Sequence, residues 1–182
     1  MRQLIVYLCL ITLVGCSTLI NVNFVSLGQD LNWKIQPASS MNQVVDQTVL
    51  LTAKHNGKTH KMIVSTQSES NTFAMVAMTV QGVPLFELVL DDQGKITNKT
   101  YISLPIKAEY ILSDMQIISL PFDEVKKNLL GNNVDVEISA NGKKRMISND
   151  QSTVINIEYK NNTTQFIHHQ RNYELIIEAI KK

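Results

Sequence analysis

The chain has 182 residues, 44% of them hydrophobic, with 17 Lys and Arg against 16 Asp and Glu. This length suffices for one domain with a substantial core. Because the charges nearly balance, the chain has no strong electrostatic attraction for nucleic acid or anionic lipid headgroups, and we expect no nucleic-acid partner.

The first sixteen residues have the order of a bacterial lipoprotein signal. Arg2 gives a short basic start, Leu4 to Val14 are almost all apolar, and small residues lead to Cys16. This order resembles the lipobox and predicts that residues 1–15 are a signal peptide, removed before an acylated Cys16. An apolar run of roughly 11 residues is too short to span a ~30 Å hydrocarbon core. The alternatives are an ordinary secretory signal or a buried N-terminal helix.

Acylation would fix the location of the mature chain. Acyl chains on Cys16, each methylene contributing ~0.8 kcal/mol, would anchor the protein to a bilayer. Lipoproteins kept in the inner membrane usually carry Asp after the cysteine, and here Ser17 follows. We therefore expect the outer membrane of a Gram-negative bacterium, with the body facing the periplasm. Cys9 would leave with the signal peptide, so no disulfide is expected.

The segment after the signal carries a weak pattern. Residues 17–40 mix Asn, Ser, Gln and Pro with scattered apolar residues, so we interpret 16–42 as a lipidated N-terminus and tether. It includes a poorly specified first element, with Trp33 docking on the body. The domain itself is expected over 43–182.

From residue 43 the pattern has mostly period two, which predicts strands with one buried face. The first predicted strands cover 49–53, 60–64, 73–80, 85–90 and 95–102, with turns at Asn56-Gly57, Gln81-Gly82 and Gln93-Gly94. The segment 73–80 is apolar on both faces, as in a strand covered on two sides. Short connections favour an antiparallel meander.

The pattern then changes to helical spacing. One helix is predicted over 106–115 and a second over 120–131, where Phe122, Val125 and Leu129 share a face. Strands resume at 134–138, 145–148, 155–159, 165–168 and 173–180. About ten or eleven strands interrupted once by helices predict a mainly β (α+β) fold, an antiparallel open β-barrel with the helices on its concave side.

Three local motifs carry a family resemblance. They are the hairpin 73–90 around Gln81-Gly82, the proline-led helix at 120–131 and the closing strand 171–175. Their order over 43–182 resembles the LolA/LolB lipoprotein-carrier fold, and more closely the LolB-like lipoprotein family DUF3261. The resemblance implies an open barrel, lined by aliphatic residues and lidded by helices, that holds acyl chains. Members are often encoded beside genes for aryl-polyene or fatty-acid-like synthesis, which implies a lipidic cargo.

The hairpin tip departs from LolB. LolB has an exposed leucine before a glycine at this tip, whereas Gln81 precedes Gly82 here and Val83 follows. We take these three residues as the membrane-contact tip. A polar side chain does not enter hydrocarbon favourably, so the carrier pocket is expected without lipoprotein insertion.

The predicted function is binding or transfer of an acyl chain or other lipidic cargo in a hydrophobic cavity, with selectivity from shape and not from a charged anchor. The cavity candidates are Phe73, Met75, Met78, Phe86, Leu88, Ile111, Leu112 and Phe122. These residues could equally be ordinary core. The alternative function is a structural or scaffolding lipoprotein that binds a periplasmic protein partner.

No motif of an enzyme, cofactor or metal site stands out. His168 and His169 are adjacent on a predicted strand and would point to opposite faces, so they are poorly placed to share a metal ion. His55 and His60 flank a predicted turn, and Asp114 has no visible partner. We therefore expect no catalytic residue, no metal and no cofactor.

Overall fold

The computed structural model describes residues 18–21, 24–41, 46–69, 71–103, 106–150 and 152–180. The predicted signal peptide and Cys16 lie outside the described residues. Within these ranges, no helix is long and apolar enough to cross a membrane.

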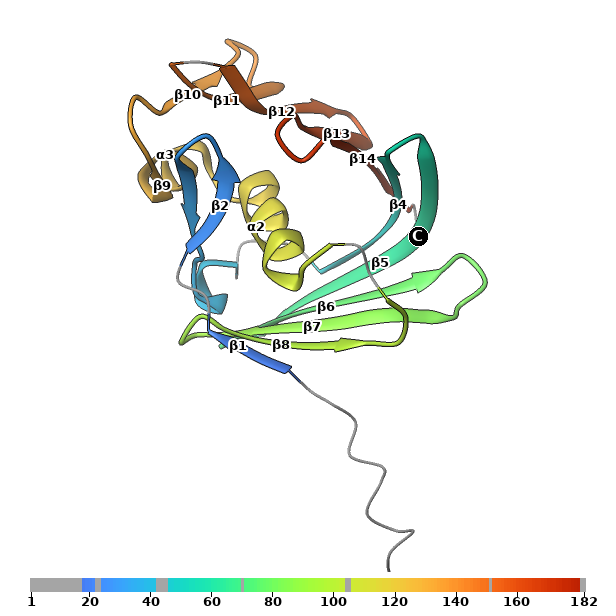
Figure 1. The fold of residues 1–182 in the computed structure, drawn as a ribbon. Helices are drawn as coiled ribbons and strands as arrows, with labels where there is room; N and C mark the ends of the chain where they lie inside the picture. Colours follow the sequence, from blue (N-terminus) through green and yellow to red (C-terminus); the bar gives the residue numbers. More distant parts are fainter. Residues whose placement is uncertain are drawn as a thin grey trace, which may run out of the picture.

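Eleven strands of the described residues form one antiparallel sheet (Figure 1). In the order of the sheet they are β1 (Thr18–Asn21), β8 (Lys95–Thr100), β7 (Pro84–Asp91), β6 (Thr72–Thr79), β5 (Lys58–Glu69), β4 (Gln47–His55), β14 (Tyr173–Ala179), β13 (Thr163–His168), β12 (Ser152–Lys160), β11 (Lys144–Asn149) and β10 (Asp135–Ile138). The sheet curves strongly, and its end strands β1 and β10 are not paired with each other in the described part of the chain. The prediction of a mainly β, antiparallel fold is confirmed.

Alternation along the strands separates a concave core face from a convex face. In β6, Phe73, Met75 and Ala77 are buried, whereas Ala74 and Val76 between them are partly exposed. Because successive side chains point to opposite faces, the buried set lies on the concave side, where the helices pack. The sequence predicted that β6 is covered on two sides, but the described residues cover only the concave one.

The segment predicted as a tether is largely folded. Three strands, β2 (Phe24–Gly28), β3 (Leu31–Lys34) and β9 (Leu129–Leu130), form a second sheet in the order β2-β3-β9, and the 3-10 turn η1 (Ala38–Met41) follows β3. The structure therefore places residues 24–41 in the body. Each strand is too short to show a clear period, and the pairing with β9 joins residues almost 100 positions apart.

Two helices lie on the concave side of the sheet, α2 (Ala108–Ser119) and α3 (Phe122–Asn128) (Figure 1). The second helix was predicted to continue to Gly131, but it ends at Asn128. Leu129 and Leu130 pair instead with Trp33 and Asn32 of β3. A local pattern cannot reveal this competing partner from the N-terminal segment.

Candidate functional site

The concave face of the large sheet is packed unevenly. Under β6, β7 and β8, the side chains of Phe73, Leu88, Leu90 and Ile96 have no exposed surface. The turn η1 packs against β6 and β5, and α2 packs against β8. This part of the face is closed. The part formed by β10 to β13 is also closed, over Ile147, Ile155, Ile157 and Phe166.

Another part of the face, formed by β4, β5 and β14, is covered less completely, although Val49 and Val64 of these strands are buried. Leu51, Met62, Leu175 and Ile177 are only partly buried. The register puts all four on the concave face, because Leu51 pairs with both Met62 and Ile177, and Leu175 lies two residues from Ile177. Apolar side chains of the sheet therefore remain partly accessible here.

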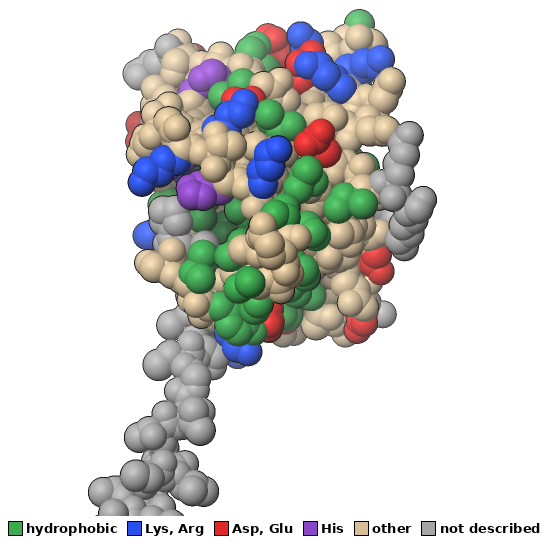
Figure 2. Space-filling model, turned by 90° about the vertical axis from the view of Figure 1, so that its right-hand side faces the viewer, with side chains coloured by type: hydrophobic (Ala, Val, Ile, Leu, Met, Phe, Trp, Pro, Cys, Tyr) green, Lys and Arg blue, Asp and Glu red, His purple; other side chains and the backbone are tan. Residues whose placement is uncertain are grey.

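Helix α2 presents a matching set of apolar side chains. Ile111, Met115 and Ile118 are partly buried and recur at spacings of four and three, so they share one face of the helix. We call these three residues, together with Leu51, Met62, Leu175 and Ile177, the apolar opening. Figure 2, which views the right-hand side of Figure 1, shows hydrophobic side chains gathered across the centre and lower part of that face.

Long polar side chains hold the C-terminal half of α2 to the sheet. The Arg145 guanidinium donates to the backbone carbonyls of Ile117 (2.5 Å) and Leu120 (3.0 Å), and the Tyr159 hydroxyl donates to that of Ile118 (2.9 Å). These carbonyls lie at the helix C-terminus, where a cation is favourable. These hydrogen bonds therefore join the C-terminal end of α2 to β11 and β12.

A buried carboxylate makes a further attachment in the middle of α2. Asp114 is 2% exposed, accepts a hydrogen bond from the Tyr173 hydroxyl, and pairs with Arg171, whose Nη1 lies 3.5 Å from Oδ1. The Arg171 guanidinium also lies 3.7 Å from the centre of the Tyr110 ring and donates to the Ser26 carbonyl. Burial raises the pKa of Asp114 from 3.8 to about 7, although both Tyr173 and Arg171 oppose this rise.

On its opposite side, α2 is hydrogen-bonded to the N-terminal segment through Gln116. Buried Gln116 accepts from the Trp33 indole N–H (2.9 Å) and the Gln36 backbone N–H (3.0 Å), and it donates to the Gln36 carbonyl (2.8 Å). The docking of Trp33, expected from the sequence, thus involves a specific buried amide.

The predicted cavity residues fall into three groups. Phe73, Met75, Phe86, Leu88 and Leu112 are buried in the core, Met78 lies on the convex face of β6, and only Ile111 and Phe122 are partly buried beside the core. Of the eight, only Ile111 belongs to the apolar opening. The sequence analysis missed the contributions of β4, β5 and β14, although their alternation already marked one apolar face.

The predicted membrane-contact tip lies at one end of the sheet. This end, called here the Gly82 end, contains the β4–β5, β6–β7 and β13–β14 turns and the last residues of β8. Gln81, Gly82 and Val83 are all exposed. Val80, Tyr101 and Ile102 add exposed apolar surface, and the Tyr101 N–H donates to the Leu85 carbonyl beside the β6–β7 turn. We call Val80, Val83, Tyr101 and Ile102 the apolar patch.

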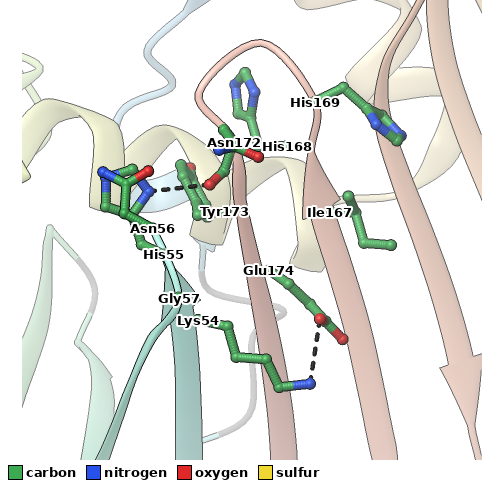
Figure 3. A pocket seen from close by; sticks show the side chains of 10 residues that line it. All are labelled: Lys54, His55, Asn56, Gly57, Ile167, His168, His169, Asn172, Tyr173 and Glu174. Carbon is green, nitrogen blue, oxygen red and sulfur yellow. Dashed lines mark hydrogen bonds and ion pairs between the residues drawn. The ribbon is translucent and has the colours of Figure 1, made fainter.

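The Gly82 end also carries a polar hollow of about 320 Å³ between the β4–β5 and β13–β14 turns (Figure 3). Its functional groups are already engaged: Lys54 pairs with Glu174 (3.2 Å), and His55 Nδ1 lies 3.0 Å from the Asn172 carbonyl. No group of three metal-ligating side chains occurs in the parts of the chain that the structure describes.

The histidine pair lies on opposite faces of the sheet edge. His168 is fully buried, and burial lowers its pKa to about 3, so it is neutral at pH 7. His169 is exposed, and its Nε2 lies 3.1 Å from Asn156. This arrangement does not bring the two rings to one ligand.

Comparison with known proteins identifies the family. A comparison with curated proteins gives no match. The family model described as "Protein of unknown function (DUF3261)" matches residues 46–181, which begin just before β4 and extend beyond β14. The chain therefore belongs to the DUF3261 family.

Proposed function

We propose that this protein is a periplasm-facing, outer-membrane lipoprotein that binds or transfers an acyl chain or another lipidic molecule in the apolar opening. The observation that carries this proposal is the half-covered apolar surface between the concave face of β4, β5 and β14 and the Ile111–Met115–Ile118 face of α2. In this proposal the curved sheet acts as an open barrel of the LolA/LolB type.

The packing of α2 supports entry of a hydrocarbon chain. Burial of each methylene is worth about 0.8 kcal/mol, so even a short acyl chain gains several kcal/mol by covering this surface. The helix is attached to β14 through Asp114, and to β11 and β12 through Arg145 and Tyr159. The side chains of the apolar opening pack against the core but keep partly exposed surface, which an acyl chain would cover.

The pairing of β1 with β8 indicates that the proposed anchor, Cys16, would lie near the Gly82 end of the sheet. Thr18 pairs with Asn98, three residues before Tyr101. Cys16 is two residues before Thr18, a reach of at most about 7 Å. Acyl chains on Cys16 would thus start near the apolar patch, so we propose that the Gly82 end faces the bilayer. Although Gln81 is polar, exposed Val80 and Val83 flank it.

Binding is tested with a fluorescent fatty acid and a chain that begins at residue 17, which keeps every described element. Leu175→Trp should fill the opening and abolish binding. Ile176→Trp is the matched control, because the neighbouring side chain points to the convex face, and it should bind like the wild type. Thermal unfolding checks that both variants are folded. Equal binding by two folded variants would place the ligand elsewhere.

The anchor has its own test. Cys16→Ser should leave an unprocessed precursor that no longer incorporates radioactive palmitate, whereas Cys9→Ser should still be processed and labelled. Undiminished label on Cys16→Ser would reject the lipoprotein proposal.

A scaffolding lipoprotein is the second candidate, and the packing of the core favours it. Five of the eight predicted cavity residues are buried, and β6 leaves Ala74, Val76 and Met78 partly exposed on its convex face, where a partner could pack. Absence of binding by every lipid probe would favour this function over cargo binding.

A further inference from the structure

We propose that the ligand of the apolar opening is an amphiphile with an anionic head, a carboxylate or a phosphate, which Lys58 and His60 hold at the Gly82 end. This inference rests on the proposed function and adds the chemistry of the ligand to it. It replaces the sequence-based expectation of selectivity from shape without a charged anchor.

The register of β5 puts the two polar side chains in line with the apolar opening. Strand β5 is paired with β4 without interruption from Lys58 to Thr66. Side chains two residues apart share a face, so Lys58 and His60 lie on the same face as Met62 and Val64. Val64 is buried in the core and Met62 belongs to the opening. One side of a single strand thus changes from apolar to polar as it reaches the Gly82 end.

The spacing of these side chains along β5 suits a ligand with a polar head and an apolar tail. At about 3.3 Å per residue, His60 lies roughly 7 Å and Lys58 roughly 13 Å along the strand from Met62. Both side chains are exposed, so they are accessible to a ligand head that stays at the surface. A tail directed along Met62 and Leu51 would cover the partly exposed part of the concave face.

The charges at this end favour an anion. Within the described ranges neither Lys58 nor His60 forms an ion pair, and Glu174, Glu109 and Asp114 each pair with a basic side chain. Glu174 lies on the convex face with Lys54, Glu109 pairs with Lys107 (3.9 Å), and Asp114 is buried with Arg171. Figure 2 shows basic, acidic and histidine side chains in the upper part of the face that carries the hydrophobic band. An amphiphile bound here would contact the apolar side chains with its tail and the basic side chains with its head.

The test compares a fatty acid with its methyl ester, which has the same tail and no charge. With the chain from residue 17 at pH 7, we expect the acid to displace a fluorescent acyl probe at about tenfold lower concentration than the ester, as one charge-assisted contact implies. Lys58→Gln with His60→Gln should remove this preference and leave ester binding within about twofold. Lys61→Gln, on the convex face of the same strand, is the matched control and should preserve the preference.

Two further outcomes separate the possibilities. An alkyl phosphate with the same tail distinguishes the source of the head: the anion that competes better, carboxylate or phosphate, is the one this site recognises. Equal affinity for acid and ester, or an unchanged preference in the double variant, would overturn the anionic head while cargo binding stands. If no probe binds, both proposals fail together.

Discussion

Two parts of the concave face, one formed by β6, β7 and β8 and the other by β4, β5 and β14, differ in how completely their apolar side chains are covered. Both groups of strands belong to the same sheet, but burial recurs at every second residue in β6 and not in β4 or β14. In the first part, Phe73 and Leu88 are fully buried, whereas in the second part Leu51 and Leu175 are only partly buried. The difference in burial comes from the elements that pack on the concave face of the sheet.

Above β6, β7 and β8 lie the folded N-terminal segment and the Gln116 side of α2, which bring apolar side chains and a satisfied amide. Over β4, β5 and β14, Asp114 of α2 is bonded to Tyr173, whereas Arg145 and Tyr159 attach the helix to β11 and β12. Leu51 and Leu175 remain only partly buried in this part of the face. This accessible part is therefore the region of the molecule most suited to a hydrophobic ligand.

Removal of a core side chain should give the largest difference between the two parts. Leu88→Ala leaves a cavity in a closed region and should lower the free energy of unfolding by about 2–5 kcal/mol. Leu175→Ala removes the same atoms from a partly exposed position and should cost roughly 1 kcal/mol. Urea unfolding measures both values. Similar losses for the two variants would mean that the two parts are equally packed.

Disruption of the attachment of α2 should have a smaller effect. Arg145→Met keeps most of the side-chain volume but leaves the carbonyls of Ile117 and Leu120 without their donor, at a cost of about 1–3 kcal/mol. Lys144→Met removes an exposed charge next to it and should change the unfolding free energy by less than about 0.5 kcal/mol. An unchanged free energy of unfolding in Arg145→Met would show that apolar packing alone holds the helix.

Asp114 should make the stability depend on pH. Its pKa is higher in the folded chain, about 7, than its ordinary value of 3.8, so its contribution is complete below about pH 4 and is lost as pH rises towards 7. Asp114→Asn should therefore gain stability relative to the wild type over this range, by at most about 1.4 kcal/mol per pH unit. His168, with its pKa lowered to about 3, titrates in both proteins and cancels from this difference.

Urea unfolding of the two proteins at several pH values between 4 and 7.5 gives the difference directly. Parallel stability curves would show that Asp114 is ionised throughout and that its pairing with Arg171 dominates over burial.

The smallest effect is expected in a fluorescence test of whether the Gly82 end faces the bilayer. In the acylated protein in vesicles, an environment-sensitive fluorophore on Val83→Cys should shift to shorter wavelength because the apolar patch meets the bilayer. Asn141→Cys lies in the turn between β10 and β11 at the opposite end of the sheet and should show no shift. A shift at both positions, or at neither, would contradict the proposed orientation.

The amino-acid sequence by itself determined the mainly β, antiparallel class, the approximate positions of most strands of the large sheet and the presence of a helical pair, because period-two and helical patterns depend on neighbours along the chain. It did not predict β1, β2, β3 or β9. Short turns such as Asn56-Gly57 can be located from the sequence alone, because Asn and Gly favour the positive φ that both residues adopt in this turn. The opposite faces of His168 and His169 follow from the same local geometry.

Only the tertiary structure decided which apolar residues form the closed core and which remain accessible. Phe73 and Leu175 look alike in the sequence, and their burial differs because the N-terminal segment covers one part of the sheet. Asp114 had no visible partner in the sequence, because Arg171 lies in the β13–β14 turn and Tyr173 begins β14, both more than 50 residues later. Long-range contacts of this kind depend on how the sheet curves and what it encloses, which no local period encodes.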